Sequence, residues 1–262
     1  MVEEIVMRNV FIMGCGRSGT SLTAGILGKA GYFMGNRLTS PNETNPKGQF
    51  EDGEVNTINE ELLAGIVPGK PKGILGRILF RSRPGFGQRW LAEVSVRERV
   101  KPSALMGQRI SELTSRQPYC FKDPRFSYTL PAWRPFVRNA VFVCVFRDPA
   151  STGKSITRQA GRVPHLKDLC VTFEKSLRVW MLMYRHILEI HRNEGEWLFL
   201  HFNQLVGGGG VDRIESATGA LVDRSFPDPK LRQSFSDAEV PDQTMRVYST
   251  LCELAQYDER SE

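Results

Sequence analysis

The chain has 262 residues, enough for one α/β domain with a full hydrophobic core, and 35 Lys and Arg side chains against 29 Asp and Glu give a formal net charge of +6. A positive balance favours anionic ligands in general. No apolar run approaches the ~18 residues of a membrane span, and the N-terminal MVEEIVMRN is too short and too acidic for a signal peptide. We therefore expect one domain over residues 1–262 and a soluble, cytoplasmic protein.

The cysteines and histidines do not indicate a metal site. None of the five cysteines belongs to a C-x-x-C pair, and the four histidines are dispersed along the chain. Three of the cysteines lie in or beside apolar runs, so we expect mainly buried free thiols and no bound metal. The cysteines are Cys15, Cys120, Cys144, Cys170 and Cys252.

The most informative stretch is residues 10–27, VFIMGCGRSGTSLTAGIL. Its apolar start predicts a strand buried on both faces, and its glycines allow a tight loop before a helix that begins at about Thr20 and ends near Gly31. Free backbone N–H groups and the positive end of the helix dipole converge on such a loop, which can bind a phosphate or sulfate group. The residues expected to contact that group are Gly14, Cys15, Gly16, Arg17, Ser18, Gly19, Thr20 and Ser21.

The spacing of Gly14 and Gly19 matches the first half of the nucleotide-binding motif G-x-x-x-x-G-K-[ST], but Thr20 occupies the lysine position. The run GRSGTS after an apolar strand instead resembles the 5′-phosphosulfate loop of sulfotransferases that use 3′-phosphoadenosine 5′-phosphosulfate (PAPS). This resemblance implies an α/β, P-loop-like three-layer fold with a central, mainly parallel sheet flanked by helices. It also implies that PAPS is the sulfuryl donor.

The segment NPKGQFEDGE, residues 45–54, precedes a helix predicted over residues 54–63. Its three acidic residues are Glu51, Asp52 and Glu54. Acidic residues at this point are usually helix caps and dipole partners, although one of them could be a base. The segment resembles the NP-x-G-x-F-E run of bacterial sulfotransferases, and several branches of that superfamily use a glutamate from this side of the site. Glu51 matches that position and is the candidate catalytic base.

Residues 65–101 are rich in Gly, Pro and basic residues, and we interpret them as an insert or lid. One interpretation is a solvated lid whose charges attract PAPS. The other is a basic amphipathic face with Ile74, Leu75, Ile78 and Leu79, suited to weak association with an anionic membrane surface. Against two acidic side chains, residues 70–101 contain nine basic ones: Lys70, Lys72, Arg77, Arg81, Arg83, Arg89, Arg97, Arg99 and Lys101.

Two helices are predicted around residues 88–100 and 103–115, followed by a short strand over residues 118–122. The run KDPRF then places Lys122, Asp123 and Arg125 at the carboxyl end of this strand, where ligands gather in open α/β sheets. A surface turn with an ion pair is the alternative. The run KDPR also resembles a motif of the same family, in which the lysine lies near the transferred group, and this makes Lys122 a candidate catalytic residue.

Residues 140–146, AVFVCVF, form the strongest predicted strand. Arg147 follows it directly, and Ser155 lies two helical turns further along a predicted helix. A guanidinium and a hydroxyl so placed can both contact one phosphate. The arrangement RDP with a serine eight residues after the arginine resembles the 3′-phosphate site of the same sulfotransferases.

The remaining third of the chain predicts an amphipathic helix from Leu169, a strand over residues 197–202 and a closing helix over residues 237–255. The aromatic stripe of the first helix, which includes Trp180 and Tyr184, is expected in the core. A basic loop with Arg158, Arg162 and His165 is expected over the site. Asn203 and Gln204 stand where the family commonly has an acidic residue.

Together these motifs predict a sulfotransferase that moves a sulfuryl group from PAPS to a hydroxyl or amine of a small-molecule, carbohydrate or lipid acceptor. Arg17, the loop amides and Lys122 would stabilise charge on the leaving nucleotide, and Glu51 would take the acceptor proton. A P-loop phosphotransferase is disfavoured by Thr20 and by Arg147, which is not an acid. A nucleic-acid-binding module is disfavoured because few aromatic residues accompany the basic segment.

Overall fold

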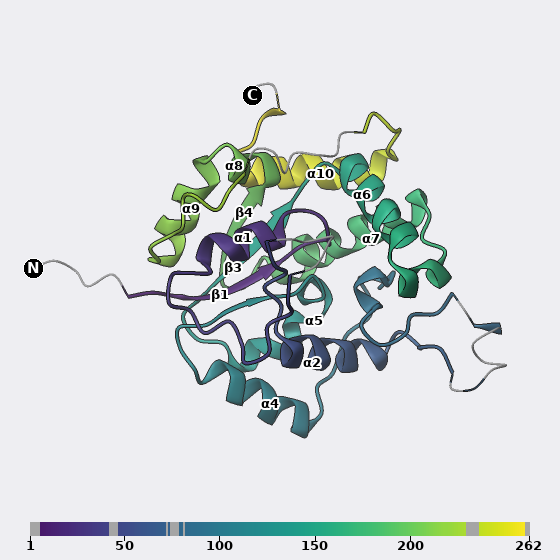
Figure 1. The fold of residues 1–262 in the computed structure, drawn as a ribbon, viewed down its shortest axis with the longest axis horizontal. Helices are drawn as coiled ribbons and strands as arrows, with labels where there is room; N and C mark the ends of the chain where they lie inside the picture. Colours follow the sequence, from purple (N-terminus) through teal and green to yellow (C-terminus); the bar gives the residue numbers. More distant parts are fainter. Residues whose placement is uncertain are drawn as a thin grey trace, which may run out of the picture.

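The computed structural model describes residues 6–41, 47–71, 73, 79–80, 82–228 and 236–259. Four parallel strands form one sheet in the order β2-β1-β3-β4. Figure 1 shows the strands at the centre of the molecule, with α2, α4 and α5 at one end and α10 at the other. After β1 the chain continues to β2 on one side of the sheet, and after β3 it continues to β4 on the other side. The topological switch point therefore lies between β1 and β3. The strands are β1 (Asn9–Met13), β2 (Cys120–Lys122), β3 (Ala140–Phe146) and β4 (Glu196–His201).

Helices alternate with the strands along the chain. Short 3₁₀ turns occur at Arg89–Leu91, Arg134–Phe136 and Pro164–Leu169, and a π-helical turn, Ile187–His191, extends α7. The α-helices are α1 (Thr20–Leu27), α2 (Gly53–Ala64), α4 (Ala104–Thr114), α5 (Phe126–Trp133), α6 (Pro149–Arg162), α7 (Phe173–His186), α8 (Phe202–Val206), α9 (Gly209–Thr218) and α10 (Asp242–Ala255).

Side chains alternate between the two faces of the sheet, which separates the core into two clusters. Val10 and Ile12 face a cluster built with α1, α8 and α9. Phe11 and Met13 face a larger cluster that includes residues of α2, α4, α5, α7 and α10. Helices therefore cover both faces of a fully parallel sheet, and the predicted three-layer α/β fold is confirmed.

Most predicted elements are present, but the helix predicted around residues 88–100 is wrong. Only Arg89–Leu91 forms a helical turn there. Side chains from distant helices satisfy the carbonyl groups of this segment: the Tyr128 hydroxyl donates to Ala92 O at 3.0 Å, and His186 Nε2 lies 3.2 Å from Val94 O. The first helix also ends at Leu27, earlier than the predicted stop at Gly31.

The aromatic stripe of α7 lies in the core, as predicted, and its Tyr184 reaches the backbone of the loop after β1. The Tyr184 hydroxyl accepts a hydrogen bond from Cys15 N at 3.0 Å and donates one to Val145 O at 2.7 Å. Gly14 has a φ of 135°, and a Cβ there would lie 2.1 Å from Val145 O. The loop backbone is therefore packed directly on β3.

Three of the five thiols, those of Cys15, Cys120 and Cys144, are buried, and all five cysteines are free. Burial raises the pKa of the Cys15 thiol far above its ordinary value, so this loop residue is a neutral side chain at physiological pH. No helix in the described part of the chain is long and apolar enough to cross a membrane.

Gly14→Ala and Gly31→Ala form a matched pair that measures how closely the loop approaches β3. Both glycines have a positive φ, but the position of a Cβ on Gly31 is open space. We expect Gly31→Ala to cost about 1 kcal/mol of unfolding free energy and Gly14→Ala at least about 2 kcal/mol more, because the added methyl group meets a backbone oxygen. Urea unfolding measures both values, and equal costs would contradict the close approach.

The unfolding free energy should also depend on His191. Burial lowers its pKa to about 3, and its Nε2 lies 3.0 Å from Ser127 O. Below pH ~6.5 the unfolded chain binds a proton that the native imidazole does not, so native stability falls as pH falls. Between pH 6.5 and 5 the wild type should lose about 2 kcal/mol more than His191→Gln. Parallel stability curves for the two proteins would show that His191 does not have this pKa.

Candidate functional site

The loop between β1 and α1 adopts an unusual backbone. Arg17 has a left-handed φ of 70°, and Gly19, the N-cap of α1, has a φ of 103°. The Ser18 hydroxyl is buried and has no hydrogen-bond partner among the described residues. A buried hydroxyl without a partner, beside a helix N-terminus, is suited to an anionic ligand.

Arg17 and Ser155, predicted separately from two motifs, lie together. Arg17 Nε donates to Ser155 Oγ at 3.2 Å, which joins the loop to α6. Burial lowers the pKa of Arg17, and the nearby charge of Arg158 lowers it further. A second positive charge beside a largely buried guanidinium is unfavourable in the protein alone and favourable once an anion is bound.

Arg147 belongs to the same site because it shares a neighbour with the loop. Its guanidinium carbon lies 4.6 Å from the centroid of the Phe202 ring. The edge of the same ring lies 2.8 Å from the position that a Cβ on Gly19 would take. Arg147, the loop and Ser155 are therefore brought to the carboxyl ends of β1 and β3, at the switch point of the sheet.

Glu51 and Lys122 form a second, adjacent cluster. Lys122 pairs with Ile12 across β2 and β1, two residues before the loop begins, and its Nζ lies 2.5 Å from Glu51 Oε1. Asn56 Nδ2 donates to the other carboxylate oxygen at 3.0 Å. Burial by itself would raise the pKa of Glu51, but the charges of Lys122 and Arg125 outweigh it and lower the pKa, so Glu51 is ionised.

Asp123 and Arg125 are not a surface turn. Arg125 Nη1 lies 2.9 Å from Asp123 Oδ1, and Arg125 Nε lies 2.7 Å from Glu60 Oε1, with all three side chains buried. Glu60 also binds Arg89, whose Nη1 lies 2.9 Å from Glu60 Oε2. The predicted ion pair exists within a larger buried network that extends to the segment 85–91.

The two other acidic residues near Glu51 have structural partners. Asp52 caps α2 by accepting from Glu54 N and Val55 N, and Glu54 pairs with Arg37 and Arg109. Two of the three acidic candidates for a base are thus structural, and Glu51 is the one that contacts Lys122. The basic loop predicted with Arg158, Arg162 and His165 is wrong as a loop, because Arg158 and Arg162 lie on α6 and His165 lies in the 3₁₀ turn that follows; all three side chains are exposed.

Asn203 and Gln204 attach the C-terminal helix to the site. Asn203 Nδ2 donates to the Tyr257 hydroxyl at 2.8 Å, and Gln204 Nε2 donates to Ala255 O at 2.9 Å. These bonds account for the amides at positions where the family commonly has an acid. In this chain the positions serve packing of α10.

Sequence reasoning missed three residues around the site: Tyr184, Glu60 and Trp90. Tyr184 has the signature of a core residue, and its hydroxyl bonds to Cys15 N and Val145 O are not visible in a helical stripe. Glu60 lies on the buried face of α2. An acidic residue at a buried position of a predicted helix indicates an ion-pair partner, because buried acids require partners. Trp90 carries no sequence signal.

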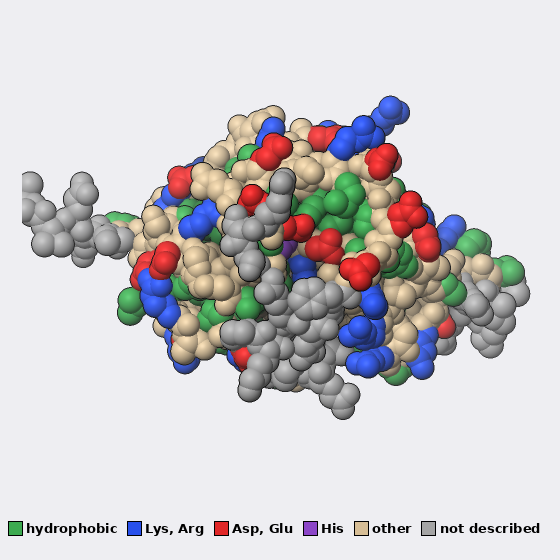
Figure 2. Space-filling model, turned by 90° about the horizontal axis from the view of Figure 1, so that it is seen from above, with side chains coloured by type: hydrophobic (Ala, Val, Ile, Leu, Met, Phe, Trp, Pro, Cys, Tyr) green, Lys and Arg blue, Asp and Glu red, His purple; other side chains and the backbone are tan. Residues whose placement is uncertain are grey.

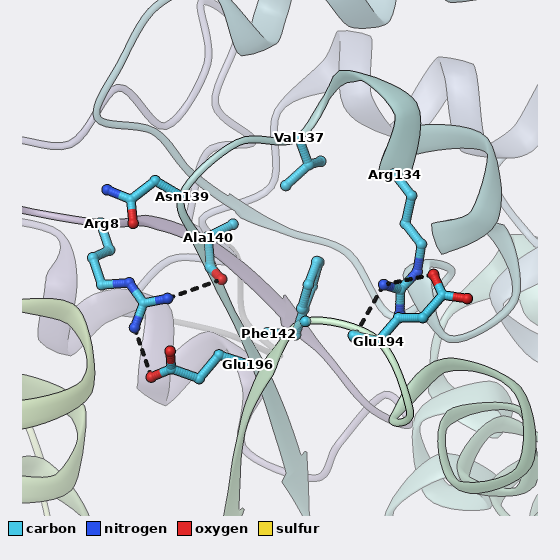
Figure 3. A pocket seen from close by; sticks show the side chains of 9 residues that line it. Arg8, Arg134, Val137, Asn139, Ala140, Phe142, Glu194 and Glu196 are labelled. Carbon is cyan, nitrogen blue, oxygen red and sulfur yellow. Dashed lines mark hydrogen bonds and ion pairs between the residues drawn. The ribbon is translucent and has the colours of Figure 1, made fainter.

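A pocket of about 760 Å³ lies at the opposite end of the sheet, where β3 and β4 begin (Figure 3). Its arginines are engaged by neighbours: Arg8 lies 2.6 Å from Glu196, and Arg134 lies 3.4 Å from Glu194. Because ligands of open parallel sheets bind at the carboxyl ends of strands, this pocket does not compete with the loop as the candidate site.

Charge is unevenly distributed over the surface. Figure 2 shows acidic side chains gathered around a central group of hydrophobic ones on one face. The positive charge of the candidate site comes from Arg17, Arg147 and Lys122, and Arg158 adds a further charge near Arg17. In residues 6–41, 47–71, 73, 79–80, 82–228 and 236–259, no group of three or more His, Cys, Asp or Glu is placed to hold a metal ion. The exposed acids of residues 236–259 are Asp237, Glu239, Asp242, Glu253, Asp258 and Glu259.

Comparison with known proteins supports the fold and the family. Two solved structures are similar: the sulfotransferase domain from the olefin synthase of Synechococcus PCC 7002 (18% identity, TM-score 0.55, 95% of this chain and 94% of that chain) and the sulfotransferase domain from the curacin biosynthetic pathway (14% identity, TM-score 0.55, 97% and 99%). At such identities the similarity concerns the fold alone. A search of the curated proteins finds no significant match.

The family model described as "Sulfotransferase family" matches residues 9–208, a span that begins with β1 and includes the loop, Glu51, Lys122, Arg147 and Ser155. The chain belongs to the sulfotransferase family.

Proposed function

We propose that this protein is a PAPS-dependent sulfotransferase that transfers the sulfuryl group to a hydroxyl or amine of its acceptor. Its family supports sulfotransfer in general. The observation that carries the choice of donor is the 3.2 Å hydrogen bond between Arg17 and Ser155, which brings the loop and α6 together. PAPS has two anionic ends, a 5′-phosphosulfate and a 3′-phosphate, and the site offers two groups of donors.

The residues of the site fit these two ends. The loop contributes backbone N–H groups, the positive end of α1 and the unpartnered Ser18 hydroxyl, which suit the phosphosulfate. Arg147 and Ser155 suit the 3′-phosphate, because a guanidinium and a hydroxyl both donate to phosphate oxygens. The close approach of Gly14 to β3 fixes the backbone of this loop against the central strand.

In the proposed reaction, the bond between sulfur and the bridging phosphate oxygen breaks, and a bond between sulfur and the acceptor oxygen or nitrogen forms. The products are the sulfated acceptor, 3′-phosphoadenosine 5′-phosphate (PAP) and a proton. Negative charge grows on the bridging oxygen, where Arg17, the loop amides and Lys122 would stabilise it. The proton of the acceptor would pass to a carboxylate oxygen of Glu51.

The pair of Glu51 and Lys122 supports these two roles. Glu51 is ionised, so it can accept a proton, and the charge of Lys122 lowers its pKa. Lys122 has three N–H donors, so its ammonium group can bind Glu51 and a sulfuryl oxygen together. When Lys122 binds the transferring sulfuryl group, its positive charge stabilises the Glu51 carboxylate less. The pKa of Glu51 then rises, and Glu51 becomes a stronger base.

A nucleotide phosphotransferase is the rival enzyme class, and nothing in the site favours it. Thr20 begins α1 at the position where a nucleotide-binding P-loop has its lysine. Arg147, not an acid, follows the central strand β3. No observation favours a nucleic-acid-binding module.

The role of residues 65–101 as a lid, weak association with an anionic membrane surface and a cytoplasmic location stay predictions. Arg77 and Arg81, like Ile74, Leu75 and Ile78, lie outside the described residues. Within the described part, Leu79 and Phe80 are exposed, and the Arg83 guanidinium lies 4.2 Å from the centroid of the Phe80 ring. An exposed apolar pair beside a cation is compatible with both a lid and a membrane contact.

Arg147→Ala tests the nucleotide assignment. We expect PAP binding to weaken by about 1.5–3 kcal/mol, the usual size of a hydrogen bond to a charged group, with a smaller loss for Ser155→Ala. Arg134→Ala is the matched control, because Arg134 also lies over an aromatic ring, 5.0 Å from the centroid of Phe142, but at the opposite end of the sheet. Calorimetry with PAP measures all three variants, and an unchanged affinity in Arg147→Ala would exclude this 3′-phosphate site.

Glu51→Gln tests the base. The substitution keeps the shape and removes the proton acceptor, so turnover should fall ~10²-fold or more while PAP affinity stays within about threefold of wild type. PAP release from PAPS is measured with whichever hydroxyl or amine compounds of an acceptor panel the wild type sulfates. Glu61→Gln, which removes a charge from the outer side of α2, should leave release unchanged. Near-normal release by Glu51→Gln would show that Glu51 is not the base.

A further inference from the structure

The indole ring of Trp90 lies directly on the backbone of the anion-binding loop. A Cβ on Gly16 would be 2.6 Å from Cζ3 and 2.9 Å from Cε3 of Trp90. Gly16 is not among the glycines with a positive φ, so its backbone conformation does not require a glycine. What excludes a side chain from Gly16 is the indole ring.

Buried hydrogen bonds of Gln88 and Arg89, the two residues before Trp90, hold the segment that carries the ring. Arg89 donates from its backbone N to Glu60 Oε1 at 3.0 Å, from Nη1 to Glu60 Oε2 at 2.9 Å and from Nε to Val67 O at 3.1 Å. Gln88 Nε2 donates to His165 O at 2.7 Å, in the segment that follows α6. The ring is thus fixed both to α2 and to the chain that continues from Ser155.

The contact matters because the next residue, Arg17, has a strained backbone. A left-handed φ of 70° is unfavourable for a residue with a Cβ, and such conformations persist only where the surroundings impose them. On one side Arg17 is held by Ser155 Oγ. On the other side, Trp90 limits the movement of Gly16.

We propose that Trp90 is a positioning residue for the donor nucleotide: its ring holds Gly16, and through it Arg17, in the conformation that binds the phosphosulfate. This inference rests on the proposed function, because it concerns the affinity of the loop for PAPS and PAP. Glu60 supports Trp90 through Arg89 and binds Arg125, three residues after Lys122. The same carboxylate therefore connects the support of the donor loop to the cluster of Glu51 and Lys122.

The test is a double-mutant cycle between Gly16 and Trp90, read out by PAP calorimetry. Trp90→Ala should weaken PAP binding about tenfold, because the loop loses its support, and Gly16→Ala should weaken it more, about thirtyfold, because the methyl group displaces the loop. In the double variant, Gly16→Ala with Trp90→Ala, the added methyl group has space. The PAP affinity of the double variant should therefore be within about threefold of that of Trp90→Ala alone. Trp197→Ala, which removes an indole near the start of β4, should bind PAP like the wild type.

Each outcome of this cycle has a distinct meaning. If the losses of PAP affinity in the two single variants add up in the double variant, Gly16 lacks a side chain because of the ligand and not because of Trp90. That result would overturn the inference. Wild-type affinity in a folded Trp90→Ala protein would also overturn it. Should Trp90→Ala fail to fold, Trp90→Phe, which keeps an aromatic ring, must show a weaker loss of the same sign. A wild-type protein that does not bind PAP would instead refute the proposed donor, and with it the inference.

Discussion

The candidate site depends on the two hydrogen bonds of the Tyr184 hydroxyl. The hydroxyl joins the loop to β3 by accepting from Cys15 N and donating to Val145 O, within a fully buried environment. One side chain thus satisfies a backbone N–H of the loop and a backbone carbonyl of β3. With Gly14 packed against the same Val145 carbonyl, the shape of the loop is imposed by the central strand and by α7.

A second constraint is the network of buried charges around Glu60. Its carboxylate binds Arg89 and Arg125, and Asp123 binds Arg125 and Asn59. Burying charges is costly unless each is paired and hydrogen-bonded, so such a network has one favourable geometry. That geometry relates the loop after β1, through the segment before Trp90, to the strand end that carries Lys122.

The parallel sheet explains why these parts meet. Strands β1, β2 and β3 all end at the same edge, so the loop, Lys122 and Arg147 reach one rim although Lys122 and Arg147 lie more than a hundred residues after the loop. The helix that follows β3 then returns Ser155 to Arg17. One rim of the sheet therefore collects the polar and charged side chains of the candidate site.

Sequence alone determined the strands at residues 10–13 and 140–146, the loop and the positions of Arg147 and Ser155. Buried parallel strands are continuous apolar runs, glycines permit the turn, and two helical turns fix the spacing of the arginine and the serine. Only the tertiary structure decided that residues 92–100 are not helical, that Glu51 rather than Asp52 meets Lys122, and that Trp90 lies on Gly16. In each case the deciding partner is distant in sequence: Tyr128 and His186 replace helical hydrogen bonds, and packing against another element overrides the local preference of the chain.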